Sequence, residues 1–376
     1  MTPLATIALI AGALSLLRYV VALPILARWL RRGTVRSMPA GATPPITLLK
    51  PLYGADRDLE ANLEATLRQN YPEFEVLFLH EREHDPALAA VEIARARVPD
   101  VSVRVLPGRD AQATNPKAAV LIEGERAARY SILAAADSDV RPDPLYLRDI
   151  ANALADADAV SFAPLLFGAQ GLPARLAAFA VNTDGLLSLL VCRGRLMTGS
   201  TVGVRREALD AIGGWAAVGD RIADDIALGR ALRHAGSRIV LARRAARVVA
   251  PDGGWASTAG WMTRWARTAR VAHPPLYAAA LPFVFAPLLL LLAIATGPVA
   301  GHGWLLAGIA AARIGTAVAI ELRYIWDGSM LRTIVYLPLL WILEPCWFLA
   351  GLLGRTINWR GRRYRLKGDR ATLVAE

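Results

Sequence analysis

Residues 132–139 read Ile-Leu-Ala-Ala-Ala-Asp-Ser-Asp, a short apolar run that ends in two aspartates. The apolar run predicts a buried strand over 132–136, which Asp137 and Asp139 follow directly. In a turn after the strand, the two carboxylates can converge on one divalent cation. Mg²⁺ or Mn²⁺ held in this way also binds substrate phosphate oxygens and neutralises the charge of a departing diphosphate. The alternative interpretation is that Asp-Ser-Asp is only a good turn sequence.

The sequence before this strand alternates between short apolar runs and stretches with helical spacing. Such alternation predicts an α/β domain with a mostly parallel sheet and helices on both faces. Ligands of such sheets bind at the carboxyl ends of the strands, which is where Asp137 and Asp139 lie. The other predicted strands are 46–49, 74–79 and 101–106, and the predicted helices are 58–69, 86–98 and 117–128.

Both ends of the chain are strongly apolar, whereas its middle has the mixed composition of a soluble domain. Residues 4–26 are long enough to span a bilayer, and because no basic residue precedes them we favour a span over a signal peptide. Arg18, inside this run, is expected to face other helices rather than lipid. The two cysteines are too few for a disulfide framework or a zinc site. Further apolar segments are 276–296, 304–320 and 332–353.

The chain carries a net charge of +11, and its basic residues cluster beside the apolar segments. This pattern is typical of anchoring to anionic lipid headgroups and disfavours nucleic acid as the partner. Arg28, Arg31, Arg32 and Arg36 follow the first apolar run, so the chain from residue 30 onward is expected in the cytoplasm. The predicted parts are a membrane anchor over 1–36, a linker over 37–45, a catalytic domain over 46–275, a membrane region over 276–354 and a basic cytoplasmic tail over 355–376.

The basic tail conflicts with a simple count of membrane spans. Three full spans after residue 275 would place the tail outside, yet dense basic clusters stay inside. We therefore expect one segment not to cross, and 332–353 is our choice. Pro338 and Pro345 interrupt a straight helix there, and Glu344 would cost roughly 2.5–3.5 kcal/mol at a bilayer centre. The tail then lies against the catalytic domain or serves only as an anchor on the membrane surface.

Two further clusters are suited to chemistry. Asp224 and Asp225 open a helical pattern, so they either cap that helix or supply a general base that takes the proton of an attacking hydroxyl. One carboxylate is enough for capping, so both interpretations can hold. Arg264 can bind diphosphate through its planar fork, and Trp265 can contribute to an acceptor pocket. The alternative for this pair is an interfacial amphipathic helix with both side chains at the headgroup level.

Taken in order, these residues and several short motifs resemble the ceramide glucosyltransferase family. The bacterial hopanoid-associated glycosyltransferases share nearly the same set, and the resemblance covers about residues 46 to 367. The C-terminal run 359–366, Trp-Arg-Gly-Arg-Arg-Tyr-Arg-Leu, also resembles the end of those enzymes. The motifs are Lys50-Pro51-Leu52-Tyr53-Gly54, Asn70-Tyr71-Pro72, Asp85-Pro86-Ala87, Asn115-Pro116-Lys117, Asp137-Ser138-Asp139, Ala223-Asp224-Asp225 and Arg264-Trp265.

The resemblance implies a Rossmann-like GT-A fold, a UDP-sugar donor, a divalent cation and inversion at the anomeric carbon. Two departures bear on the donor sugar rather than on the fold: Trp261 replaces a family Gln or Arg, and residues 81–84 read Glu-Arg-Glu-His. The resemblance implies three family aspartates, which are matched by Asp100, by Asp137 with Asp139, and by Asp225 as the base. It also implies that Asp137 and Asp139 bind the metal and that Lys50, Pro51 and Lys117 line the donor site. Arg264 and Trp265 would close the site near the membrane.

The expected function is that of a multi-pass inner-membrane enzyme whose catalytic domain faces the cytoplasm. It would move a sugar, glucose by the resemblance, from a UDP-sugar to the hydroxyl of a membrane lipid such as ceramide. The alternative within this class is a hopanoid acceptor with UDP-N-acetylglucosamine as donor. The rival classes are a processive polysaccharide synthase, which would need more membrane helices and a longer chain, and a non-catalytic membrane scaffold.

Overall fold

A computed structural model of the protein describes residues 2–31, 43–108, 113–192, 196–297 and 299–375. Arg32, Arg36 and residues 37–42 of the expected linker lie outside the described residues. The chain divides into two compact units, which we call the helical unit and the sheet unit. The helical unit combines Met1–Leu30, Leu166–Val191 and Ala250–Ile357, and the sheet unit combines Arg31–Leu165, Cys192–Val249 and Asn358–Glu376.

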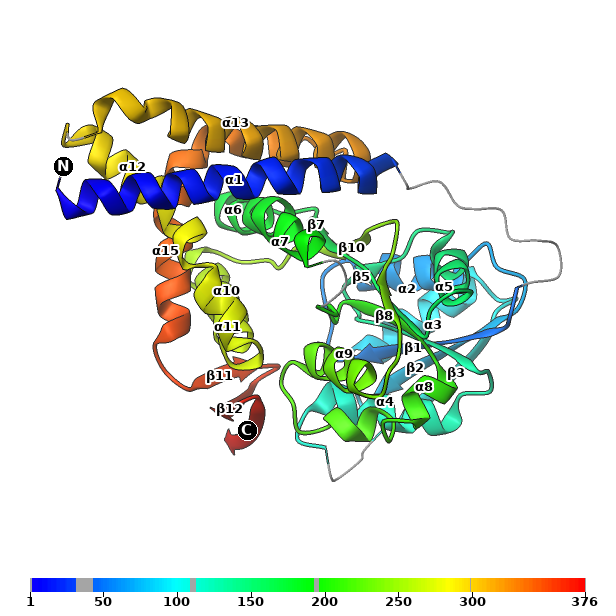
Figure 1. The fold of residues 1–376 in the computed structure, drawn as a ribbon. Coiled ribbons are helices and arrows are strands. Elements are labelled where there is room, and N and C mark those ends of the chain that lie inside the picture. Colours follow the sequence, from blue (N-terminus) through cyan, green and yellow to red (C-terminus); the bar gives the residue numbers. More distant parts are fainter. Residues whose placement is uncertain (1, 32–42, 109–112, 193–195, 298, 376) are drawn as a thin grey trace. The chain divides into compact units, whose positions relative to one another are not determined.

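The sheet unit is built on a seven-stranded sheet with the order β3-β2-β1-β4-β8-β6-β9 (Figure 1). The first four of these strands are parallel, as predicted, and each overlaps its predicted range closely. β8 runs antiparallel to both of its neighbours, and β9 is parallel to β6. The strands are β1 (Ile46–Leu52), β2 (Phe74–His80), β3 (Ser102–Pro107), β4 (Ile132–Ala136), β6 (Ala159–Ser161), β8 (Thr201–Arg205) and β9 (Ile239–Leu241).

The three helices predicted between the first four strands are present. They close the parallel crossovers, because successive parallel strands need a helix-sized connection. Gly124 lets one of them approach the sheet, since a Cβ there would lie 2.5 Å from a methyl carbon of Leu79. The helices of this unit are α2 (Leu59–Leu67), α3 (Ala87–Arg97), α4 (Pro116–Ala127), α5 (Tyr146–Leu154), α8 (Arg206–Asp210), the short 3₁₀ helix η2 (Trp215–Val218) and α9 (Asp224–His234).

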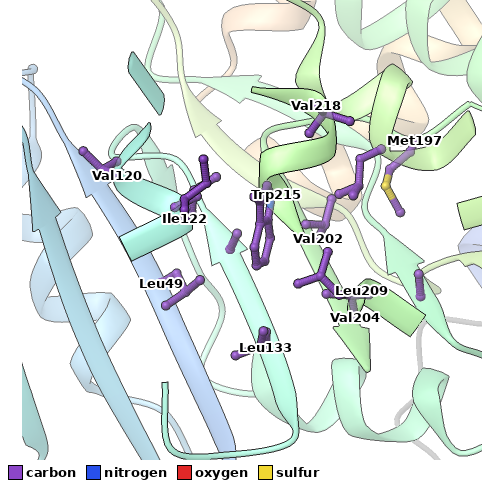
Figure 2. Packing of buried hydrophobic residues seen from close by; sticks show 14 of the residues in the cluster. Leu49, Val120, Ile122, Leu133, Met197, Val202, Val204, Leu209, Trp215 and Val218 are labelled. Carbon is purple, nitrogen blue, oxygen red and sulfur yellow. The ribbon is translucent and has the colours of Figure 1, made fainter. Parts of the chain in front are cut away.

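A buried apolar cluster joins the sheet to α4 and η2 (Figure 2). Trp215, at the start of η2, is 1% exposed and belongs to the same cluster as Leu49 and Leu133 from adjacent strands. Val120 of α4 and Val204 of β8 belong to the same core. Ala135 of this core is the penultimate residue of β4, so the core reaches the strand end that the Asp-Ser-Asp turn follows.

Two smaller sheets extend the framework. β5 (Val140–Arg141), β10 (Ala246–Val249) and β7 (Pro164–Phe167) form one of them in the order β5-β10-β7. The C-terminal tail, for which the sequence suggested no strands, forms the other from β11 (Thr356–Trp359), β12 (Arg362–Lys367) and β13 (Arg370–Ala375). From Asn358 onward the tail is part of the sheet unit.

The helical unit holds all five helices of the described residues that are long and apolar enough to cross a membrane. Four correspond to the expected segments, and the fifth, Gly171–Val191, lies inside the region assigned to the catalytic domain. The elements are α1 (Pro3–Arg31), α6 (Gly171–Ala180), the π-helical stretch η1 (Val181–Gly185), α7 (Leu186–Val191), α10 (Trp255–Ala272), α11 (Pro274–Ala279), α12 (Leu281–Ala295), η3 (Ala300–His302), α13 (Gly303–Ile320), η4 (Glu321–Ile325), α14 (Ser329–Thr333), η5 (Ile334–Tyr336) and α15 (Leu337–Leu352).

Four charged side chains pair inside the helical unit. Arg18 of α1 donates to the carboxylate of Asp184 in η1, which confirms that Arg18 faces other helices. Arg313 of α13 is 1% exposed, lies 3.3 Å from Asp184 and donates to both oxygens of Glu344 in α15. Glu344 is therefore not an isolated charge, and its pairing with Arg313 offsets the insertion cost that the sequence assigned to it.

Chain connectivity restricts which apolar helices can span. β6 and β8 are hydrogen-bonded neighbours in one sheet, so the two flanks of Gly171–Val191 lie on the same side of any membrane. This single helix therefore does not complete a crossing. Val249 and Asn358 also both belong to the sheet unit, so an even number of crossings separates them. Three candidate spans occupy that interval, and the expectation that one of them does not cross stays a prediction.

Candidate active site

The Asp-Ser-Asp turn follows β4 at the carboxyl edge of the sheet, where the sequence predicted it. Lys50 on β1 is fully buried beneath this turn. Its Nζ donates to the carbonyl oxygens of Asp137 at 2.6 Å and Val140 at 2.9 Å. Nδ2 of buried Asn62 donates to the carbonyl of Ser138 at 3.1 Å. These bonds hold the backbone of the turn in place.

The two carboxylates of the turn differ in their partners. Asp137 forms an ion pair with Lys117 at 2.8 Å. Oδ1 of Asp139 is buried and has no hydrogen-bond partner among the described residues. Burial, Asp137 and Asp56 raise the pKa of Asp139 to about 7. A divalent cation would satisfy this orphaned oxygen and remove the repulsion between the carboxylates.

The donor set suits a cation that shares its coordination with a ligand. Within the described residues, no group of three or more His, Cys, Asp and Glu side chains is arranged to hold a metal ion. Mg²⁺ and Mn²⁺ sites on phosphate substrates commonly use one or two carboxylates and fill the remaining positions with phosphate oxygens and water. Asp137 and Asp139 therefore fit such a cation, whereas they do not form a closed structural metal site.

Lys117 connects this turn to the second acidic cluster. It lies in the first turn of α4, where Asn115 caps the helix by accepting from the backbone N–H groups of Lys117 and Ala118. Nζ of Lys117 contacts Asp137 at 2.8 Å and Asp224 at 3.6 Å, and it donates to the carbonyl of Gly199 at 2.8 Å. Burial lowers the pKa of Lys117, but these carboxylates outweigh it and the net change is a rise. The ammonium is therefore a permanent positive charge between the two clusters.

Asp225 opens α9 beside Asp224. One carboxylate oxygen accepts from the backbone N–H of Ile226 at 2.8 Å. The N-cap position of α9 is Ala223 and no side chain caps this helix, so neither aspartate is its N-cap. The side chain packs against Gly199, where a Cβ would lie 2.8 Å from the second oxygen. Burial and then the neighbouring Asp224 raise the pKa of Asp225 to about 7. A carboxylate with a pKa near neutrality is suited to general base chemistry at physiological pH.

Two other predicted donor residues lie differently. Pro51 is buried within β1, in register with Leu79 of β2, and is part of the strand rather than of an open site. Asp100 is exposed in the turn before β3, at the amino end of that strand. Because the ligand edge is at the carboxyl ends, roughly 20 Å away along a six-residue strand, the structure does not bring Asp100 to Asp137. The donor-site role of Asp100 came from the family resemblance, whereas the predicted strand over 101–106 already places this residue at the amino end.

Arg264 and Trp265 lie on α10, in the helical unit. The ring of Trp265 packs at a tilt of 35° against Trp261, one turn earlier, with centroids 4.4 Å apart, and Trp265 is 38% exposed. The departure at position 261 thus provides a second indole beside the Arg-Trp pair. Further along α10, Arg267 and Arg270 donate to carbonyls at the end of α15, which ties these two helices together.

Ceramide glucosyltransferases of other organisms are similar to this chain in sequence. Ceramide glucosyltransferase 1 of Caenorhabditis elegans is 26% identical over 211 residues, which cover 54% of this chain and 45% of that protein. The chain therefore spans about half the length of this relative. Ceramide glucosyltransferase 3 of the same organism is 24% identical over 344 residues, covering 86% of this chain and 73% of that protein.

The fold also has a solved counterpart. The mannosyltransferase PcManGT from Pyrobaculum calidifontis, in complex with GDP-Man and Mn²⁺, is 22% identical and superposes with a TM-score of 0.55. The match covers 93% of this chain and 97% of that chain, and it confirms the predicted GT-A fold. Residues 4–372 match the sequence profile of glycosyl transferase family 21. Since that match takes in nearly the whole chain, the protein belongs to glycosyl transferase family 21, as the resemblance implied.

Proposed function

We propose that the protein is a membrane-bound inverting glycosyltransferase that transfers glucose from UDP-glucose to the primary hydroxyl of ceramide. The observation that carries this proposal is the arrangement of Asp137, Lys117 and Asp225 at one edge of a GT-A sheet. The family, the relatives named as ceramide glucosyltransferases and the apolar helices support a lipid acceptor. No residue on its own selects the sugar, so the choice of donor rests on the relatives.

Asp137 and Asp139 would hold a divalent cation, which binds the donor diphosphate and stabilises the charge that develops as UDP departs. The remaining steps belong to side chains of the chain itself. Lys50 and Asn62 keep the turn in place, so that both carboxylates are pre-organised before the donor binds. The ammonium of Lys117 lies against Asp137 and limits the negative charge of the acidic edge.

Asp225 acts as the general base. The acceptor oxygen attacks the anomeric carbon as the bond from that carbon to the diphosphate oxygen breaks, and the hydroxyl proton passes to the Asp225 carboxylate. A single displacement of this kind inverts the anomeric configuration. The pKa of about 7 for Asp225 leaves a large fraction ionised at neutral pH and still gives a base strong enough to accept the proton. Arg264 and Trp265 remain predicted substrate-binding residues on α10.

The acceptor would reach the enzyme from the bilayer. The helical unit provides apolar helices for membrane insertion, and Arg28 and Arg31 at the end of α1 favour a cytoplasmic location for the chain beyond residue 31. We therefore place the catalytic unit on the cytoplasmic face of the inner membrane. A processive polysaccharide synthase is a weaker alternative, because the same residues would also have to form a polymer channel.

Purified full-length protein in nanodiscs with Mg²⁺ tests this function. UDP release is measured with UDP-glucose in the presence and absence of ceramide, together with mass spectrometry of the lipid fraction. We expect UDP release that depends on ceramide and equals the glucosylceramide formed. Release of UDP with a different sugar or lipid only would overturn the named substrates. No release with any tested lipid would overturn the enzymatic function and favour a scaffold.

A further inference from the structure

The basic tail is docked on the sheet unit. β12 and β13 form an antiparallel hairpin in which Tyr364 is 1% exposed. Arg362 donates to both carboxylate oxygens of Glu81, at 3.0 Å each, in the loop that follows β2. At its other end, Asp369 pairs with Arg221 and Arg230, and the N–H of Ala371 donates to the carbonyl of Asp220. These contacts fix the tail along the carboxyl edge of the sheet.

The turn between β11 and β12 carries an unusual residue. Its two residues, Arg360 and Gly361, have φ values of 51° and 76°, which is the pattern of a type I′ hairpin turn. Asn, Asp and Gly are preferred at the first position, because a side chain with a Cβ is strained at positive φ. An arginine held there against that preference indicates a role for its side chain.

Arg360 and Arg82 both contact the ring of Tyr53, which follows β1. Their guanidinium carbons lie 4.9 Å and 4.4 Å from the ring centroid. The hydroxyl of Tyr53 donates to the Arg360 carbonyl and accepts from the Arg82 guanidinium, so it fixes both chain segments. Across the part of the chain that the structure describes, neither guanidinium has a carboxylate partner in an ion pair.

The two guanidinium groups lie beside the candidate metal site. Tyr53 and Arg82 follow β1 and β2 at the edge where Asp137 and Asp139 follow β4. The positive charge of Arg360 also acts on the carboxylate of Asp139. Two guanidinium groups held against one aromatic ring, neither of them in an ion pair among the described residues, favour an anionic ligand.

We propose that Arg360, together with Arg82, binds the diphosphate of the nucleotide donor, so that the C-terminal hairpin supplies part of the donor site. This inference rests on the proposed function. Arginine matches phosphate oxygens with its planar fork, and the location at the carboxyl edge is that of ligands in such sheets. A cation held by Asp137 and Asp139 would also coordinate the diphosphate. One diphosphate could therefore contact both this cation and the two guanidinium groups.

Arg360→Gly is the informative variant, because glycine suits the positive φ and should leave the hairpin intact or more stable. Arg365→Ala is the matched control, since it removes one exposed charge from the same tail outside the turn. Titration calorimetry on the full-length protein with Mg²⁺ compares UDP with uridine. We expect Arg360→Gly to weaken UDP binding about tenfold or more and uridine binding less than twofold. The control should bind both as the wild type does.

Three outcomes would overturn the inference. The first is wild-type affinity of Arg360→Gly for UDP, and the second is an equal loss of affinity for uridine, which lacks phosphate. The third is retained UDP affinity with lost binding to phosphatidylglycerol vesicles, which would assign Arg360 to lipid headgroups instead. Failure of the proposed function is recognised separately, because the wild-type protein would then bind no UDP in the presence of Mg²⁺.

Discussion

Replacement of Asp225 by asparagine tests the base role while keeping the hydrogen bond to the next residue of the chain. The amide is nearly isosteric with the carboxylate, and its oxygen can still accept from the N–H of Ile226, so the start of α9 should be kept. The amide cannot take a proton from the acceptor hydroxyl. We expect transfer to fall by about 10²–10⁴-fold, with UDP-glucose binding nearly unchanged.

The same substitution should stabilise the fold at alkaline pH. The pKa of Asp225 is raised from 3.8 to about 7, so the folded protein holds its charged form at a cost. The difference between these two values corresponds to about 4 kcal/mol as an upper limit. Because the pKa of Asp225 is raised in the folded protein, this carboxylate does not destabilise the fold below about pH 4. The destabilisation grows as the pH rises from about 4 to about 7 and is complete above pH 7. Asparagine carries no charge, so the variant avoids the cost at pH 8.

Thermal unfolding of both proteins in detergent, without divalent cation, measures this effect from pH 5 to pH 8. The variant should be more stable than the wild type at pH 8, and the difference should shrink as the pH falls. In the wild type, kcat/KM should decrease below pH 7 as Asp225 becomes protonated. A variant with more than a tenth of wild-type turnover would refute the base assignment. A variant that is less stable at pH 8 would refute the electrostatic argument.

Three other perturbations have defined outcomes. A chelator should remove activity, and Asp139→Ala should weaken UDP binding in Mg²⁺; full activity in excess chelator would contradict the metal assignment. A single cysteine can replace Lys367 in the tail; the neighbouring Gly368 is unsuitable because its φ of 61° would strain a cysteine. This cysteine should resist an impermeant thiol reagent added outside intact cells, and external labelling would contradict a cytoplasmic tail. Arg313→Met should destabilise the helical unit by about 3–5 kcal/mol, whereas adding Glu344→Leu should restore much of the loss; equal unfolding temperatures for the single and double variants would exclude the pairing as the cause.

The sheet could be predicted well because each crossover is local in sequence. The strand over 132–136 was identified to the residue, since five apolar residues end at two aspartates. Gly171–Val191 was missed for the opposite reason. Asn182, Thr183 and Asp184 interrupt its apolar pattern, and Asn182 in the structure bonds the backbone of Leu166 in both directions. When polar residues of an apolar helix form hydrogen bonds with segments distant in sequence, the sequence pattern alone indicates a helix of a soluble domain.

The site could be predicted from local sequence only in part. Asp137 and Asp139 could be placed by the apolar strand before them and Asp225 by the helical pattern that it opens, whereas Lys117 entered only through the family resemblance. The function of Lys50 could not, because its partners are carbonyl groups 87 and 90 residues away. A lysine in a Lys-Pro motif suggests ligand binding, yet here the ammonium supports the backbone that carries the ligands.

The protein has two clusters of charged side chains, one in the helical unit and one at the candidate active site. They differ in whether their charges balance. Arg18, Asp184, Arg313 and Glu344 balance one another with two charges of each sign, so this cluster needs no ligand to be neutral. The acidic edge is different. Lys117 faces more carboxylates than it can neutralise, and one oxygen of Asp139 has no hydrogen-bond partner in the described parts of the chain. A balanced buried network stabilises a helix bundle, whereas an unbalanced one attracts a counter-ion, and in this protein the unbalanced cluster lies where the family resemblance places the reaction.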